Sequence, residues 1–316
     1  MSFGWFTVIM TAIATCAMAG CRSTEPSVDP AAVDVAAATK ETQEWRAMHE
    51  SSYRLNWATI EGLHVLEPGS HTAGSATSND IVLPASASSS RIGRFVLEGD
   101  VVRFEPAAGA RVRAGSQLVD RPLDLVDDTG EKATELEVDD IRMVVHRSGD
   151  RKTLRVWDPD GRMARGFLGF SWFPIQMAYR VTGRFIRDDK PRDVRVANTF
   201  GDIDSYQTEG VVEFALQGQT LRLRPFTTRP KRFYFVFRDA SSGRETYEAA
   251  RFLYSDLRDD GTTVLDFNQA YNPPCAFNPY TTCPIPLPEN RLAVKILAGE
   301  RAYPVHPTLP TDRNGS

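Results

Sequence analysis

Residues 94–104 read RFVLEGDVVRF, two short alternating apolar runs that are separated by Gly99-Asp100. Alternation of apolar and polar residues is the pattern of a half-buried strand, and a Gly-Asp step between two such runs is typical of a β-hairpin. Similar strand-like runs recur at 141–146, 153–157, 211–216, 220–226, 232–237, 245–254 and 263–267. Since no long helical period follows residue 57, the sequence predicts a mainly β protein.

The composition suits a folded protein with no nucleic-acid partner. The chain has 316 residues, of which 41% are hydrophobic, and this fraction is ample for a buried core. Lys plus Arg number 37 against 41 for Asp plus Glu, so a net charge of −4 provides no basic field for nucleic acid. The count of only five His and four Cys argues against a His-rich catalytic metal centre, and we predict neither metal nor cofactor.

The amino-terminal residues are typical of a bacterial export signal. Residues 5–19 carry no charge and are too few to span a bilayer core, which needs about 20 residues. The run Met18-Ala19-Gly20-Cys21 resembles the bacterial lipoprotein processing box, in which the Cys becomes the acylated first residue. This resemblance implies palmitate on Cys21 and a protein held on a membrane of the cell envelope, and Arg22 favours the outer membrane, facing the periplasm. The alternatives are an ordinary cleaved signal and an unprocessed anchor.

Changes in composition divide the rest of the chain. Residues 22–39 are small and polar and are expected to form a disordered tether, whereas 40–55 carry apolar residues at helical spacing. An aromatic cluster at 167–179 marks the expected junction between two domains. The cluster is either a packed core between the domains or an exposed binding surface. We therefore expect a signal peptide at 1–20, a tether at 21–39 and a helix at 40–56. A β-sandwich domain is expected at 57–157, a second β domain of sandwich or barrel type with a long irregular loop at 158–305, and a tail at 306–316.

The segment 266–300 is the most unusual part of the sequence. Six prolines between 273 and 288 preclude a regular helix or a central strand, so the segment is predicted to be a long irregular loop that is functional or tightly pinned. Asn268, Asn272 and Asn290 can satisfy loop backbone groups or can hold a hydroxyl or carbonyl of a ligand.

Arg251 lies on an alternating run, at 245–254, in which Tyr247 shares its face. If that face is the inner one, the guanidinium must be paired, because an unpaired buried charge is very costly. Asp239, Asp266 and Glu300 are the candidate partners. Such a pair either organises the loop or marks a pocket for an anionic group.

Cys275 and Cys283 are the only cysteines after Cys21. In an exported protein, two cysteines eight positions apart predict a disulfide. A zinc site and a Cys nucleophile are the alternatives, but the spacing is not typical of zinc ligands and no base is identifiable for a nucleophile.

The chain resembles a bacterial family of unknown function, the domain of unknown function numbered sixteen eighty-four. The residues that carry the resemblance are 265–268, 270–277, 282–284, 290–292 and 298–300, with further matches at 57–63, 74–75, 79–84, 239, 243, 246–247 and 251–253. The resemblance spans roughly 50–300. It implies no established activity.

A second resemblance concerns the first β domain. Gly74-Ser75, Asn79-Asp80-Ile81 and Ser90-Arg91 are similar to the forkhead-associated domain, a β-sandwich that reads phosphothreonine. That domain has a His two residues after its Ser-Arg pair, and here Ile92-Gly93 follow. The resemblance implies a sandwich fold, and we do not carry over the phosphopeptide activity.

The sequence contains no linear nucleophile–base motif, P-loop or paired C-x-x-C. We therefore predict an envelope lipoprotein that binds a small molecule or an envelope protein without catalysis. The candidate ligand-binding residues are Tyr247, Arg251, Asp266, Asn268, Asn272, Asn290 and Glu300. The alternative is a hydrolase that uses Asp266 or Glu300 as general base, with or without a metal.

Overall fold

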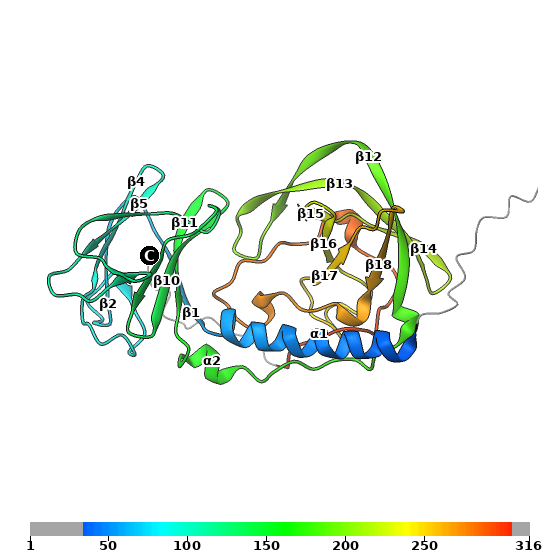
Figure 1. Ribbon diagram of the computed structural model, residues 1–316, viewed down its shortest axis with the longest axis horizontal. Coiled ribbons are helices and arrows are strands. Elements are labelled where there is room, and N and C mark those ends of the chain that lie inside the picture. The colour runs from blue at the N-terminus through cyan, green and yellow to red at the C-terminus, as the bar shows by residue number, and fades with distance from the viewer. Residues whose placement is uncertain (1–33, 305–316) are drawn as a thin grey trace, which may run out of the picture. The chain divides into compact units, whose positions relative to one another are not determined.

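The computed structural model describes residues 34–304, which form one long helix and a set of mainly antiparallel sheets (Figure 1). The predicted mainly β fold is therefore confirmed. Helix α1 spans Val35–Asn56. Cys21, the signal peptide and the tail from 306 lie outside the described residues. No helix within 34–304 is both long enough and apolar enough to cross a membrane.

The first β region is built from two sheets. Their strand orders are β1-β11-β10-β9-β6-β7 and β3-β2-β4-β5-β8. The predicted hairpin at 94–104 is β4–β5, in which Leu97 pairs with Val102. Phe95 and Phe104 from one sheet share a buried core with Val145 and Leu154 from the other, so the region is a β-sandwich. Its strands are β1 Ile60–Val65, β2 Gly69–Gly74, β3 Ile81–Val82, β4 Gly93–Glu98, β5 Val101–Pro106, β6 Arg113–Ala114, β7 Gln117–Leu118, β8 Leu123–Leu125, β9 Glu135–Val138, β10 Ile141–Ser148 and β11 Arg151–Trp157.

The second β region also has two sheets, ordered β14-β13-β12-β18 and β15-β16-β17. Neither sheet closes into a barrel within the described residues, and their apolar faces share a core that includes Phe214, Phe235 and Leu265. The strands are β12 Arg180–Ala197, β13 Ile203–Leu216, β14 Gln219–Leu223, β15 Phe226–Arg229, β16 Arg232–Phe237, β17 Arg251–Asp256 and β18 Thr262–Asp266. Short helices are α2 Arg162–Gly166, η1 Met177–Tyr179, η2 Phe267–Gln269, η3 Pro274–Ala276 and η4 Pro288–Asn290.

Two element boundaries differ from the sequence prediction. Helix α1 starts at Val35 and not at residue 40, so residues 35–39, expected in the tether, are helical, and Ala38 is buried. The strand predicted at 245–254 begins only at Arg251. The reason is a closed turn, because the Ser241 carbonyl accepts hydrogen bonds from the backbone N–H groups of Arg244, Glu245 and Thr246.

Helix α1 is held on the second β region by an aromatic cluster and by Arg46. The His49 ring stacks on Trp45 at 4.8 Å and on Phe170 at 5.3 Å, and its centroid lies 4.4 Å from that of Tyr271. Arg46 donates hydrogen bonds to the carbonyl of Asn268 at 2.9 Å and to that of Phe173 at 3.1 Å. The aromatic residues around 167–173 thus form a packed core with α1.

Side chains also join the sandwich to the second β region. Asn278 donates to the carbonyls of Trp57 and Ile60, at 3.0 and 2.7 Å. Asn198 donates to the Ser148 hydroxyl at 2.9 Å, and Arg151 forms an ion pair with Asp202. We call this line of contacts the seam.

The packing of His49 predicts a loss of stability in acid. Burial lowers the pKa of His49 to about 4 despite the nearby Glu50 carboxylate, and its Nε2 has no hydrogen-bond partner. Because an unfolded His titrates near 6.5, the unfolded chain binds the extra proton between about pH 6.5 and pH 4, and stability falls as the pH drops through that window. His49→Phe keeps the ring packing and should reduce this loss.

Urea unfolding at about pH 7 and about pH 5 measures the effect. Burial lowers the pKa of His64 to about 4 as well, so the variant should keep part of the acid sensitivity. An acid-induced loss in His49→Phe as large as in the parent would contradict the prediction.

Candidate functional site

Arg251, at the start of β17, is completely buried, and both of its terminal nitrogens bind local partners, whereas its Nε has no hydrogen-bond partner. Its Nη2 forms an ion pair with Asp239, and its Nη1 donates to the Ala298 carbonyl at 2.7 Å. Nη2 also reaches the Ile296 carbonyl at 3.2 Å. Burial lowers the pKa of Arg251, and the charge of Asp239 opposes that shift. The arginine therefore ties β17 to the last part of the 266–300 segment.

Asp239 is positioned by the turn that follows β16. Its Oδ1 accepts hydrogen bonds from the backbone N–H groups of Ser241 at 2.7 Å and Ile296 at 3.2 Å. Since Tyr247 lies beyond this turn and not on β17, it does not share a strand face with Arg251. The Tyr247 hydroxyl instead lies 3.8 Å from the Cys275 sulfur.

Asn268 and Asn290 bind backbone groups of neighbouring segments. The Asn268 side chain accepts from Gln176 N at 2.9 Å and donates to Gln176 O at 3.0 Å. The Asn290 side chain accepts from Arg224 N at 2.8 Å and donates to the carbonyls of Arg224 and Val236. Both amides thus replace strand pairing where the chain is irregular.

Glu300 and Asn272 form a second closed contact. The Glu300 carboxyl accepts from Asn272 N at 2.8 Å and from Asn272 Nδ2 at 2.9 Å, and both residues are only 1% exposed. Burial raises the pKa of Glu300 well above its ordinary value, although the hydrogen bonds from Asn272 oppose this shift. Glu300 is therefore favoured in its neutral form.

Asp266, at the end of β18, has both carboxylate oxygens occupied. Oδ1 accepts from the backbone and side-chain nitrogens of Asn268, and Oδ2 accepts from Arg180 at 2.6 Å and Thr42 at 3.1 Å. Among the seven residues selected from the sequence, Asp266 alone lines the cavity described below. The others hold the fold together around it.

The two cysteines are close but are free thiols, so the predicted disulfide is absent from the structure. The Cys275 backbone N–H donates to the Cys283 sulfur at 3.3 Å. Cys275 is half-buried, and the η3 turn at Pro274–Ala276 sets the approach of the two residues. Within residues 34–304, no three His, Cys, Asp or Glu side chains gather closely enough to hold a metal ion.

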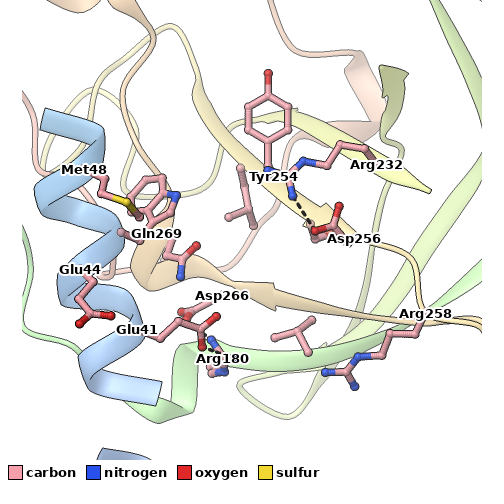
Figure 2. Close-up of a pocket in the computed structure, with 14 residues that line it drawn as sticks. Glu41, Glu44, Met48, Arg180, Arg232, Tyr254, Asp256, Arg258, Asp266 and Gln269 are labelled. Atoms are coloured by element: carbon pink, nitrogen blue, oxygen red, sulfur yellow. Dashed lines mark hydrogen bonds and ion pairs between the residues drawn. The ribbon is translucent and has the colours of Figure 1, made fainter. Parts of the chain in front are cut away.

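An open groove lies between α1 and strands β17 and β18, with a volume of about 480 Å³. Figure 2 shows Glu41 and Glu44 on the helix side, whereas Arg232, Asp256 and Arg258 lie on the other side. The lining residues are Glu41, Glu44, Trp45, Met48, Arg180, Arg232, Leu253, Tyr254, Ser255, Asp256, Arg258, Val264, Asp266 and Gln269. The sequence analysis missed this groove because α1 is far from β17 along the chain.

Most charges of the groove are already paired. Arg180 binds Asp266 at 2.6 Å and Glu41 at 3.0 Å, and Arg232 binds Asp256 at 2.8 Å. Glu44 has only a loose, exposed contact of 3.8 Å with Lys40. Within 34–304, Arg258 forms no ion pair. The groove therefore offers one available anion and one available cation, with Met48 (65% exposed) and Tyr254 (36% exposed) as apolar surface.

The Arg251–Asp239 pair yields a stability prediction. Arg251→Met leaves Asp239 buried without its counter-charge and should cost about 3–5 kcal/mol of unfolding free energy. Adding Asp239→Asn removes the lone charge while keeping the oxygen that Ser241 and Ile296 bind, so the double variant should recover part of the loss. Urea unfolding followed by tryptophan fluorescence measures both. A double variant no more stable than Arg251→Met would argue against a charge penalty.

Comparison with known proteins finds similarity mainly to the second β region. No curated protein matches the chain. The solution NMR structure of an uncharacterised protein from gene locus rrnAC0354 of Haloarcula marismortui is similar, with 29% sequence identity over 43% of this chain and 78% of that chain, at a TM-score of 0.37. Residues 165–301 match the model described as "Protein of unknown function (DUF1684)", so the matches expected between 57 and 84 lie outside it. The forkhead-associated resemblance stays a prediction. Over residues 165–301, the chain is therefore similar to the DUF1684 family, as the sequence resemblance indicated.

Proposed function

We propose that this protein is a lipid-anchored binding protein of the cell envelope whose ligand occupies the groove between α1 and strands β17 and β18. The observation that carries the proposal is the groove itself, an open volume of about 480 Å³ beside a tightly packed interior. Ligand sites are typically concave, with apolar surface and a few polar groups that fix orientation. The groove combines apolar surface with a larger number of charged and polar side chains, most of whose charges are already paired.

The available charges suggest the chemistry of the ligand. Glu44, on α1, would attract a cationic group, and Arg258, between β17 and β18, would attract an anionic one. The exposed surfaces of Met48 and Tyr254 would cover an apolar portion between them. A zwitterionic molecule with an apolar body, either a small metabolite or the end of a peptide, meets all three requirements.

The hydrolase alternative finds less support in the same geometry. Asp266 accepts four hydrogen bonds, so its lone pairs are already engaged and it is a poor proton acceptor. Glu300 is 1% exposed and bound by Asn272, so a substrate cannot reach it in this conformation. Asp266 lines the groove but is already engaged, and Glu300 is closed off from it, so neither carboxyl is well placed to act as a general base.

The anchor is proposed from the sequence, at Cys21. Acylation there would hold the protein on the outer membrane, facing the periplasm. In the sequence, Cys21 lies 14 positions before Val35, where α1 begins.

Binding in the groove predicts a charge-dependent response to zwitterions. We expect ω-amino carboxylic acids of graded length and aromatic dipeptides to raise the melting temperature, with one length preferred. Saturation at about 100 times Kd should stabilise the protein by about 2.7 kcal/mol. Arg258→Gln and Glu44→Gln should each weaken this effect, because each removes one of the two available charges.

Arg229→Gln is the matched control, since Arg229 is exposed on β15 and does not line the groove. It should bind the same compound as tightly as the parent by calorimetry. Equal affinity in Arg258→Gln, Glu44→Gln and the parent would remove the groove from consideration. If only an envelope protein binds, and these substitutions weaken that interaction, the groove is a partner surface.

Lipidation predicts different behaviour for the two amino-terminal cysteines. In a Gram-negative host, Cys21→Ala should move the protein from the membrane fraction to the soluble fraction, whereas Cys16→Ala should leave it in the membrane, because only Cys21 occupies the processing box. Mass spectrometry should find the acyl chains on the amino-terminal peptide of the parent. A parent protein that is soluble and unacylated would support an ordinary cleaved signal instead.

A further inference from the structure

Three side chains from distant parts of the sequence meet at the seam. His146 Nδ1 lies 2.6 Å from Asp128 Oδ2, and His146 Nε2 lies 3.0 Å from Thr282 Oγ1. Asp128 lies in the loop between β8 and β9, His146 lies on β10, and Thr282 lies in the proline-rich segment. The order is hydroxyl, imidazole, carboxylate.

The hydrogen-bond roles follow from the chemistry of each group. An ionised carboxylate only accepts, so the Nδ1 proton of His146 is donated to Asp128. In the neutral ring, Nε2 is then the acceptor and Thr282 Oγ1–H is the donor. The pKa of Asp128 is lowered overall. Burial raises this pKa, but the hydrogen bond from His146 and the positive charges near the carboxylate lower it by more, so the carboxylate form is favoured.

Hydrogen bonds hold Asp128 and the residue next to Thr282 in place. The Asp128 N–H donates to the Val145 carbonyl at 3.0 Å, and Asp128 Oδ1 accepts from Arg147 N at 3.0 Å. Cys283, next to Thr282, donates its N–H to the Thr199 hydroxyl at 3.1 Å and accepts from Thr199 N at 2.9 Å. These bonds fix both sides of the seam around His146.

A buried cation lies beside the three groups. Arg155, on β11, is 7% exposed, and its Nη1 lies 3.7 Å from Asp128 Oδ2. Its Nε has no hydrogen-bond partner, and its charge also interacts with Cys283. Thr282 and His146 are only half-buried, and 12% of the His146 side chain is exposed.

We propose that Thr282, His146 and Asp128 form a nucleophile–base–carboxylate triad that catalyses acyl transfer from a small carboxylic ester. The triad is defined by geometry and roles and not by sequence position, so the lack of a linear motif does not argue against it. The distances match those expected for a nucleophile, its base and the group that orients the base. The activity is separate from binding in the groove.

The reaction balances with the residues present and water. Thr282 Oγ1 attacks the carbonyl carbon of the ester, and its proton passes to His146 Nε2. The bond to the leaving oxygen breaks, and that oxygen takes the proton from His146. Water, deprotonated by the same Nε2, then hydrolyses the threonine ester, releases the acid and restores Thr282. Arg155 adds a buried positive charge beside the Asp128 carboxylate. Asp128 is the positioning residue, because it orients the base.

The test uses the purified mature protein, p-nitrophenyl acetate and a fluorophosphonate probe. We expect turnover and a phosphonylated Thr282 peptide by mass spectrometry. Thr282→Val should lower turnover at least about 100-fold and abolish labelling, whereas Thr282→Ser should keep both. Asp128→Asn should lose turnover and Asp128→Glu should recover part of it, which a merely structural role would not predict. Thr281→Val is the control, because Thr281 bonds the Asn278 carbonyl and lies outside the triad.

Two results overturn the proposal. One is a parent protein whose turnover is no higher than that of Thr282→Val and whose Thr282 is not labelled. A lower melting temperature in the variants would then show that the three residues are structural contacts of the seam. The other is turnover in the parent that survives Thr282→Val unchanged, because the hydrolysis would then occur elsewhere.

Discussion

One buried cation organises the second β region. Arg251 has no access to water, so its charge must be met inside the protein, and Asp239 and the carbonyls of Ile296 and Ala298 meet it. Taking a guanidinium out of water is tolerated only with such partners. The turn after β16 and the last residues of the 266–300 segment are therefore held to one arrangement. The position of Glu300, which follows directly, depends on the same pair.

Side-chain amides supply hydrogen bonds to backbone groups in and around the proline-rich segment. A segment with six prolines between 273 and 288 cannot form a regular ladder, yet much of it is buried, and buried backbone groups need partners. Asn268, Asn278 and Asn290 each bind the backbone of a segment far along the chain. These three amides of the polar block that carries the family resemblance are thus explained as architecture, whereas the buried Oδ1 of Asn272 has no hydrogen-bond partner.

The sequence predicted what local pattern determines. Alternating runs located most strands, and the argument against an unpaired buried charge narrowed the partner of Arg251 to three carboxylates, of which Asp239 is the one it contacts. The start of α1 was missed, because residues 35–39 resemble a linker in composition and are helical in the fold. The groove was missed because it needs α1 beside β17, and the sequence carries no signal for contacts across 200 residues.

The same limit applies to the residues that the sequence suggested for ligand binding. Some residues that look chemically active in the sequence, such as Glu300 and Asn272, are hydrogen-bonded to each other in the interior. The groups that remain available lie where separate segments meet. Arg258 faces α1 across the groove, and Thr282 faces His146 across the seam. Since a packed interior satisfies its own polar groups, an interface between segments is where a chain of this kind can keep charge and hydroxyls accessible to a ligand or substrate.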